Sequence, residues 1–133
     1  MVACGIWRSK RRLVAVVVDD DGRAAPALTA ATDDDERWGL LESLDSEHGL
    51  DYSLVLPAGL LRADAIGALA LSRGNQLWSA PQQLVNAIRN VTGPASGARV
   101  AAMLGRLLLV PGFRGHLHRV ERDAHDWRQL RLL

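Results

Sequence analysis

The stretch VACGIWRSKRRLVAVVV, residues 2–18, decides the fold. It contains two apolar runs of about strand length, residues 2–7 and 13–18, joined by the polar corner SKRR at residues 9–12. A corner this short predicts a β-hairpin. The second run is apolar at every position, which is typical of a strand that is covered on both faces. We therefore expect this hairpin at the centre of a sheet flanked by helices.

The rest of the chain predicts an α/β fold. Its pattern alternates strands and helices, and this order favours a five-stranded mixed sheet, three antiparallel hairpin strands plus two parallel strands, with helices on both faces. Further strands are expected at about residues 24–31, 51–57 and 76–80, and helices at about 33–48, 63–73, 81–91 and 96–110. In the first of these helices, Leu40, Leu41 and Leu44 share an apolar face with Trp38.

Composition favours one domain in the cytoplasm. The chain has 133 residues, 48% of them hydrophobic, which is enough for one core. Its apolar runs are far shorter than the roughly 20 residues that span a bilayer, and residues 1–12 lack the pattern of a signal peptide. The single cysteine, Cys4, lies in the first apolar run, so we expect a small buried side chain rather than a nucleophile.

The net charge of +1 hides an uneven distribution. Residues 1–64 carry 7 Lys or Arg and 12 Asp or Glu, whereas residues 65–133 carry 9 and 3. A basic half can bind nucleic acid, or the two halves can attract each other or a second subunit. The candidates for phosphate contacts are Arg73, Arg89, Arg99 and Arg106, which are spread over three predicted helices.

Residues 113–133 are predicted to form an amphipathic tail after a domain that covers residues 1–112. Apolar residues in this tail alternate spacings of 3 and 4, which predicts the seam of a helix able to pack on a partner protein or a second copy. The seam consists of Leu117, Val120, Ala124, Trp127 and either Leu130 or Arg131. We take Leu117, Val120, Trp127 and Leu130 as candidates for oligomerisation.

Four segments occur in an order and spacing known from one family. GIW at residues 5–7 is followed by Lys10, an apolar strand and the turn DG at residues 21–22. The other segments are LVLPAG at residues 54–59, WSAPQQL at 78–84 and ARVA at 98–101. They resemble the nuclease domain of the DEDD-type insertion-sequence transposases, which is itself similar to Holliday-junction resolvases. The resemblance covers about residues 2–109 and implies a ribonuclease H-like fold.

The resemblance also implies where catalytic carboxylates would stand. That family uses four acidic side chains around two divalent ions, because hard cations prefer oxygen ligands and the ions must hold the attacking and leaving oxygens. The matching positions are Trp7, Pro57 or its neighbour Ala58, Pro94 and Gly97. None of them is acidic. We therefore expect a catalytically inactive domain without metal or cofactor, derived from a mobile element and acting as an interaction or assembly module, with a protein or homodimer partner.

Alternative interpretations stay open. Asp19, Asp51 and Asp64 could supply a relocated nuclease site. Nucleic acid could be the ligand of the arginines named above. The chain could also be a module of a secretion or pilus assembly apparatus, related to actin-like ATPases, in which Ser9 and Lys10 once faced a phosphate.

Two further sets of side chains invite a functional interpretation. His116, His118, Glu121 and His125 could bind a metal, but a helix would separate the first two, so solvated histidines are favoured. Trp7 and Trp78 are expected at the edge of the vacated cleft, where they would fill the pocket or stack on a base.

Overall fold

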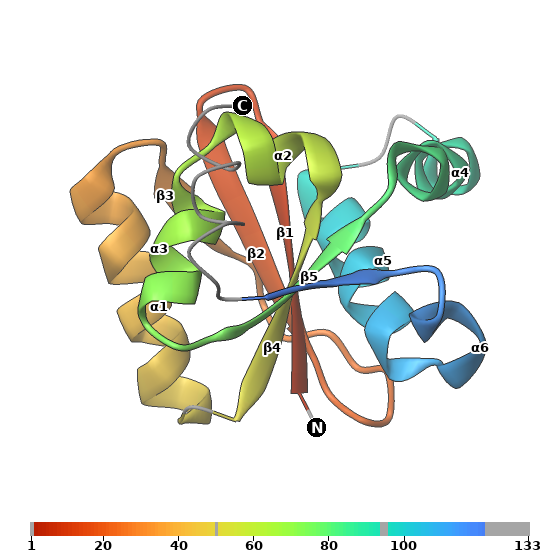
Figure 1. Ribbon diagram of the computed structural model, residues 1–133, viewed down its shortest axis with the longest axis horizontal. Helices are drawn as coiled ribbons and strands as arrows, with labels where there is room; N and C mark the ends of the chain where they lie inside the picture. The colour runs from red at the N-terminus through yellow and green to blue at the C-terminus, as the bar shows by residue number, and fades with distance from the viewer. Residues whose placement is uncertain (1, 50, 94–95, 122–133) are drawn as a thin grey trace.

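The computed structural model describes residues 2–49, 51–93 and 96–121. This part of the chain forms a six-stranded mixed sheet in the order β3-β2-β1-β4-β5-β6, with helices on both faces (Figure 1). The elements are β1 (Val2–Ser9), β2 (Arg12–Val18), β3 (Leu28–Ala31), α1 (Asp34–His48), β4 (Tyr52–Pro57), α2 (Ala58–Ala63), α3 (Ile66–Ser72), β5 (Gln76–Ala80), α4 (Gln82–Thr92), α5 (Gly97–Leu109), α6 (Pro111–Arg114) and β6 (His118–Val120). The predicted α/β class is confirmed.

The β1–β2 hairpin lies at the centre of the sheet, as predicted. β1 pairs with β2 in antiparallel fashion and with β4 in parallel fashion. Lys10 makes the tight corner with a φ angle of 58°. Leu13, Ala15 and Val17 of β2 pack into the core on the α1 side, and its other buried residues pack against α5. The unalternated apolar run is therefore explained by burial on both faces of the sheet.

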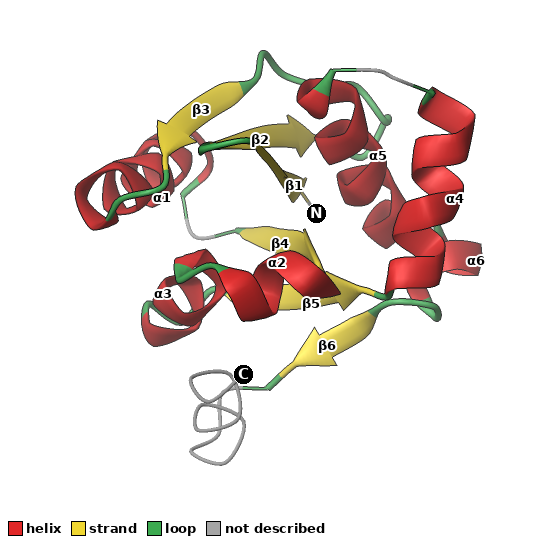
Figure 2. Cartoon of the chain, turned by 90° about the horizontal axis from the view of Figure 1, so that it is seen from above, coloured by secondary structure: helices red, strands yellow, loops and turns green. Residues whose placement is uncertain are grey.

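Two layers of helices cover the sheet. Figure 2 shows α1, α2 and α3 on one face and α4, α5 and α6 on the other. We call these the α1–α3 face and the α4–α6 face. Within the described residues, no helix is both long enough and apolar enough to cross a membrane.

Helix α5 approaches β1 unusually closely. A Cβ atom added to Gly5 would lie 1.8 Å from the carbonyl oxygen of Ala101, and one added to Gly105 would lie 3.3 Å from the backbone nitrogen of Gly5. Glycine at position 5 is therefore required by this approach. The contact also brings the first residue of α5, Gly97, to the end of β1, where Trp7 lies.

Helix α1 begins and ends as the sequence predicts. The side chain of Asp33 accepts a hydrogen bond from the Glu36 N–H at 2.9 Å, and Gly49 ends the helix with a φ angle of 64°. Leu40, Leu41 and Leu44 are buried. The prediction for Trp38 is wrong, because its side chain is 45% exposed at the surface beside α3.

The helix predicted over residues 63–73 corresponds to α3, whereas α2 was not predicted, and Asp64 lies in the break between these two helices. The Asp64 carboxylate accepts the N–H of Ile66 at 2.8 Å and is bound by Arg37 through Nε at 2.9 Å and Nη2 at 3.0 Å. Its side chain is only 2% exposed. Because a buried carboxylate needs such partners, the break in the helix positions Asp64 for Arg37 of α1.

The sheet has one strand more than predicted, because β6 lies where the amphipathic helix was expected. β6 pairs antiparallel with β5, with Val120 opposite Leu77, and covers an edge that would otherwise expose unpaired backbone groups. Leu117 is buried in the core of the α4–α6 face, whereas Val120 packs against the core of the opposite face. The two residues therefore do not form one helical seam. Trp127 and Leu130 lie outside the described residues.

Candidate functional site

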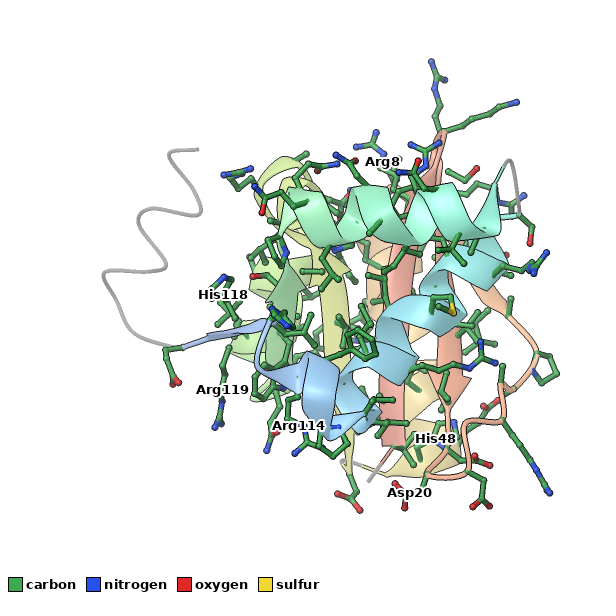
Figure 3. All side chains as sticks on the ribbon, turned by 90° about the vertical axis from the view of Figure 1, so that its right-hand side faces the viewer. Arg8, Asp20, His48, Arg114, His118 and Arg119 are labelled. Atoms are coloured by element: carbon green, nitrogen blue, oxygen red, sulfur yellow. The ribbon has the colours of Figure 1, made fainter. Side chains whose placement is uncertain are left out.

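The candidate site lies at the carboxyl ends of the parallel strands β1, β4 and β5. Loops at this end of an α/β sheet are the usual place for ligands. A shallow pocket of about 240 Å³ opens here between the ends of β1 and β4 and the starts of α2 and α4. Its lining residues include Trp7, Arg8, Pro57, Gly59 and Gln82. Figure 3 shows Arg8 at this end of the molecule and Asp20 at the other.

The Trp7 side chain occupies the space between β1 and the start of α5. Its Cδ1 atom lies 3.1 Å from the position that a Cβ atom on Gly97 would take, and the side chains of Val14 and Ser9 lie 3.4 Å and 3.7 Å from the same point. A carboxylate-bearing side chain at position 97 would therefore meet the indole ring. The structure therefore brings together Trp7 and Gly97, two of the positions that the resemblance assigns to catalytic carboxylates. The indole of Trp7 packs against the backbone of Gly97, which has no side chain.

A positive charge also lies over the indole ring. The guanidinium carbon of Arg89 on α4 is 5.6 Å from the centroid of the Trp7 ring, within the range of a cation–π interaction. Arg89 is exposed, and no acidic side chain of the described residues forms an ion pair with it. It would therefore repel a divalent cation placed beside Trp7.

The residues at the pocket do not fit a pair of divalent metal ions. Such ions need several oxygen ligands, and neither Trp7, Pro57 nor Gly97 has a side-chain oxygen. Pro94, the fourth matching position, lies outside the described residues. Among the described residues, no three His, Cys, Asp or Glu side chains are grouped so that they could hold a metal.

The three alternative carboxylates are not brought together. Asp19 accepts the N–H groups of Asp21 at 3.0 Å and Arg23 at 2.9 Å in the turn after β2. Asp51 is exposed just before β4, so both lie at the end of the sheet opposite Trp7. The Asp64 carboxylate is already bound by Arg37. Its hydrogen bond to Arg37 is also the main cause that raises the pKa of that guanidinium.

The four arginines proposed for nucleic acid divide between the two faces. Arg73 lies at the end of α3, where it forms an ion pair with Asp45 and stacks 5.1 Å from the ring centroid of Trp38. Arg89, Arg99 and Arg106 lie on α4 and α5 of the opposite face. Arg73 is therefore separated from the others and already has a carboxylate partner.

The expectation that Trp78 lies with Trp7 at the edge of the cleft is wrong. Trp78 lies on β5 in register with Val55 of β4, so a whole strand separates it from β1, and it does not line the pocket. Its indole Nε1 is buried and has no acceptor among the described residues. Arg8 and Gln82 also line the pocket, but the sequence did not identify them as site residues. Arg8 directly follows Trp7, and Gln82 lies within the WSAPQQL segment at residues 78–84.

The remaining candidates have structural roles or lie at the surface. Cys4 is fully buried, and this burial raises the pKa of its thiol to about 12, which does not favour a nucleophile. His116 and His118 are exposed, and His118 lies on β6 rather than on a helix. His125 lies outside the described residues.

Comparison with known proteins identifies the fold. No protein-family model and no curated protein sequence matches the chain. Solved structures do match, and two of them are of RuvC from Thermus thermophilus. RuvC in complex with Holliday junction substrate is 15% identical, with 90% of this chain and 99% of that chain covered and a TM-score of 0.59. RuvC alone is 15% identical, with 90% and 100% covered and a TM-score of 0.57. The chain therefore has the ribonuclease H-like fold of the RuvC Holliday junction resolvase.

Proposed function

We propose that this chain is a ribonuclease H-like domain that does not cleave phosphodiesters by a two-metal route and acts instead as an interaction or assembly module. The contact between Trp7 and Gly97 carries this proposal. In the related families the two positions would hold carboxylates, and here one is an indole and the other has no side chain.

Simple restoration of a carboxylate would not recover a metal site. A Trp7→Asp change would supply one oxygen ligand group, while Pro57 and Gly97 would still supply none. Arg89 would remain nearby and disfavour the cation. The proposal therefore rests on several positions that agree, rather than on one replacement.

A cleavage assay tests the proposal. Branched, duplex and single-stranded DNA are incubated with the purified chain and either Mg²⁺ or Mn²⁺, with an active resolvase as positive control. We expect no cleavage above background. Cleavage that is lost in an Asp19→Asn or Asp51→Asn variant would contradict the proposal and identify a relocated site. These two positions are preferred to Asp64, because Asp64 binds Arg37 and its loss would disturb folding.

Nucleic acid is a second candidate ligand for a domain that binds without cleaving. Residues 65–120 contain no Asp or Glu, and within them Arg89, Arg99, Arg106, Arg114 and Arg119 follow α4 to β6. One of the similar structures, RuvC, was solved with a Holliday junction substrate. Arg119 forms an ion pair with Glu121 at 3.8 Å, and the other four arginines form none with the described residues, which favours phosphate contacts.

Salt dependence separates phosphate binding from a protein contact. If Arg89 contacts a phosphate, the logarithm of the DNA affinity falls with the logarithm of salt concentration, and an Arg89→Gln variant loses about 0.9 from that slope. Fluorescence anisotropy with a labelled duplex measures both slopes. An unchanged slope would remove Arg89 from the DNA interface. The alternative that the chain is a module of a secretion or pilus assembly apparatus, related to actin-like ATPases, stays a prediction.

A further inference from the structure

A second hollow lies away from the strand ends, between α5, the last turn of α4 and the segment that joins β2 to β3. Its volume is about 480 Å³. The walls are largely apolar and include Val16, Ala27, Ala102 and Met103. Val91 stands at its border with 80% of its surface exposed. An open apolar hollow with such an exposed border suits a protruding side chain of another protein better than an enclosed small molecule.

Two arginines give this hollow a positive charge. Arg99 and Arg106 line it, and neither forms an ion pair with an acidic residue of the described chain. The Arg106 Nε donates to the carbonyl oxygen of Gly22 at 3.1 Å, which fixes the guanidinium at the rim. We call this hollow the Arg99–Arg106 groove. It is complementary to an apolar group flanked by carboxylates.

Such a group exists on the opposite face of the same chain. Trp38 is 45% exposed and, with Asp34, Asp35 and Leu69, lines a shallow surface hollow between α1 and α3. The Asp34 side chain is 94% exposed, although Arg37 forms an ion pair with it at 3.1 Å, and Asp35 forms no ion pair with any described residue. Arg73 stacks on the Trp38 ring and Glu42 accepts its indole N–H, so the ring is held in place. We call these residues the Trp38 surface.

We propose that the Arg99–Arg106 groove of one copy binds the Trp38 surface of a second copy. The exposed part of the indole would lie against the apolar wall of the groove, with Asp34 and Asp35 facing the two arginines. The two surfaces lie on opposite faces of the sheet, as Figure 2 shows for α1 and α5. The contact is therefore head to tail, and an open row of copies keeps one free groove at one end and one free Trp38 surface at the other. The inference names a partner for the interaction role proposed above and rests on that role, but not on the loss of cleavage.

Sedimentation velocity of the full chain, freed of nucleic acid, measures this association directly. At 50 mM NaCl we expect the average mass to rise with protein concentration. At 500 mM NaCl the rise should be much smaller, because the charged part of the contact is screened. A chain that stays monomeric at both salt concentrations would overturn the inference and leave the cleavage result unaffected.

A charge exchange tests the two surfaces themselves. Arg99→Glu and Asp35→Arg are suitable because neither side chain has an ion-pair or hydrogen-bond partner among the described residues. Each variant alone places like charges opposite each other, and we expect its self-association to weaken about tenfold or more. Mixing the two variants restores opposite charges across the contact, so association should return. Arg11→Glu at the hairpin tip makes the same charge change away from both surfaces and should have no effect.

Three results of the charge exchange would contradict the inference. Association that survives both single changes, or that does not return in the mixture although both variants unfold as cooperatively as the wild type, would overturn the inference. Loss of association in Arg11→Glu as well would show a general charge effect and would overturn it too.

Discussion

The two faces of the sheet are held in different ways. On the α1–α3 face, charged side chains reach across elements: Arg37 binds the buried Asp64, and Asp45 receives both Arg73 and the Tyr52 hydroxyl, the latter at 2.6 Å. On the α4–α6 face, α5 packs onto β1 through glycine and alanine with almost no space between the backbones. Pairs of polar side chains thus connect the elements of the α1–α3 face, whereas close backbone packing connects α5 to the sheet on the α4–α6 face.

This difference decides which charges are available to ligands. Arginines that pair with carboxylates on the α1–α3 face cannot also contact a phosphate or a partner without losing that pair. The arginines of α4 and α5 form no ion pair with a carboxylate among the described residues, and residues 65–120, which include both helices, contain no Asp or Glu. Among the described residues, the arginines without a carboxylate partner therefore include Arg89, Arg99 and Arg106 of the α4–α6 face.

The largest expected effect comes from closing the space between β1 and α5. A Gly5→Ala change would place a Cβ atom 1.8 Å from a backbone oxygen, which only a movement of the helix can relieve. We expect a loss of about 3 kcal/mol or more of unfolding free energy, against a total of about 5 to 15 kcal/mol. Gly39→Ala is the matched control on α1, where nothing lies within 4 Å of an added Cβ. It should stabilise by about 0.5 to 1 kcal/mol. Urea unfolding measures both, and equal effects would refute the close packing.

The buried ion pair gives the next largest effect. Arg37→Met removes the partner of a carboxylate whose side chain is 2% exposed, and we expect a loss of about 2 to 3 kcal/mol. The double variant Arg37→Met, Asp64→Asn removes the unpaired charge and keeps an oxygen to accept the Ile66 N–H, so it should recover part of that loss. Thermal unfolding distinguishes the variants. A double variant that is less stable than Arg37→Met would contradict this account.

Alkaline pH should act mainly through the α1–α3 face. Burial and a hydrogen bond to Asp45 raise the pKa of Tyr52 to about 12 from an ordinary value of 10.0. Between these values the unfolded chain releases the proton and the folded chain keeps it, so stability falls as pH rises from 10. Cys4, in the same core, adds a similar fall that begins near pH 9, its ordinary pKa being 9.0.

Tyr52→Phe tests that pH dependence. The variant should lose up to about 1.4 kcal/mol per pH unit from the slope of unfolding free energy between pH 10 and 12. Cys4→Ala should flatten the slope from about pH 9 upwards. Urea unfolding at several pH values measures the slopes, and a Tyr52→Phe slope equal to that of the wild type would argue against the raised pKa.

The smallest effect is expected at Trp78. Its buried indole N–H has no acceptor among the described residues, which by itself costs about 1 to 3 kcal/mol. Trp78→Phe removes this unpaired donor together with some packing area, so the two effects oppose each other and the net change should be below about 1 kcal/mol. A loss of 2 kcal/mol or more in urea unfolding would indicate that the indole N–H has a bonding partner.

Sequence reasoning succeeded where the signal was local. The run from Leu13 to Val18 is apolar without interruption, and its burial on both faces follows from that pattern alone. The caps of α1 at Asp33 and Gly49 were likewise predictable, because the residues that satisfy a helix end are its immediate neighbours. At the candidate site, the absence of carboxylates at Trp7 and Gly97 could be read directly from the resemblance.

It failed where distant residues decide the outcome. Asp64 ends α2 because Arg37, on another helix, compensates its charge, and no local pattern reveals that partner. Residues 118–120 form a strand because the edge of β5 is available to pair with them, although their spacing with later residues favoured a helix. The filling of the space between Trp7 and Gly97 depends on how closely α5 approaches β1, which is a property of the packed structure.

We propose that packed side chains around Trp7 stand where the resemblance implies a two-metal site. Paramagnetic broadening by Mn²⁺ tests it most directly, because a bound Mn²⁺ ion selectively weakens NMR signals near it. The indole N–H signals of the ¹⁵N-labelled chain, assigned with Trp→Phe variants, are followed during a Mn²⁺ titration. We predict that the Trp7 signal is not broadened selectively relative to the other tryptophans. Selective loss of the Trp7 signal that excess Mg²⁺ reverses would contradict the account.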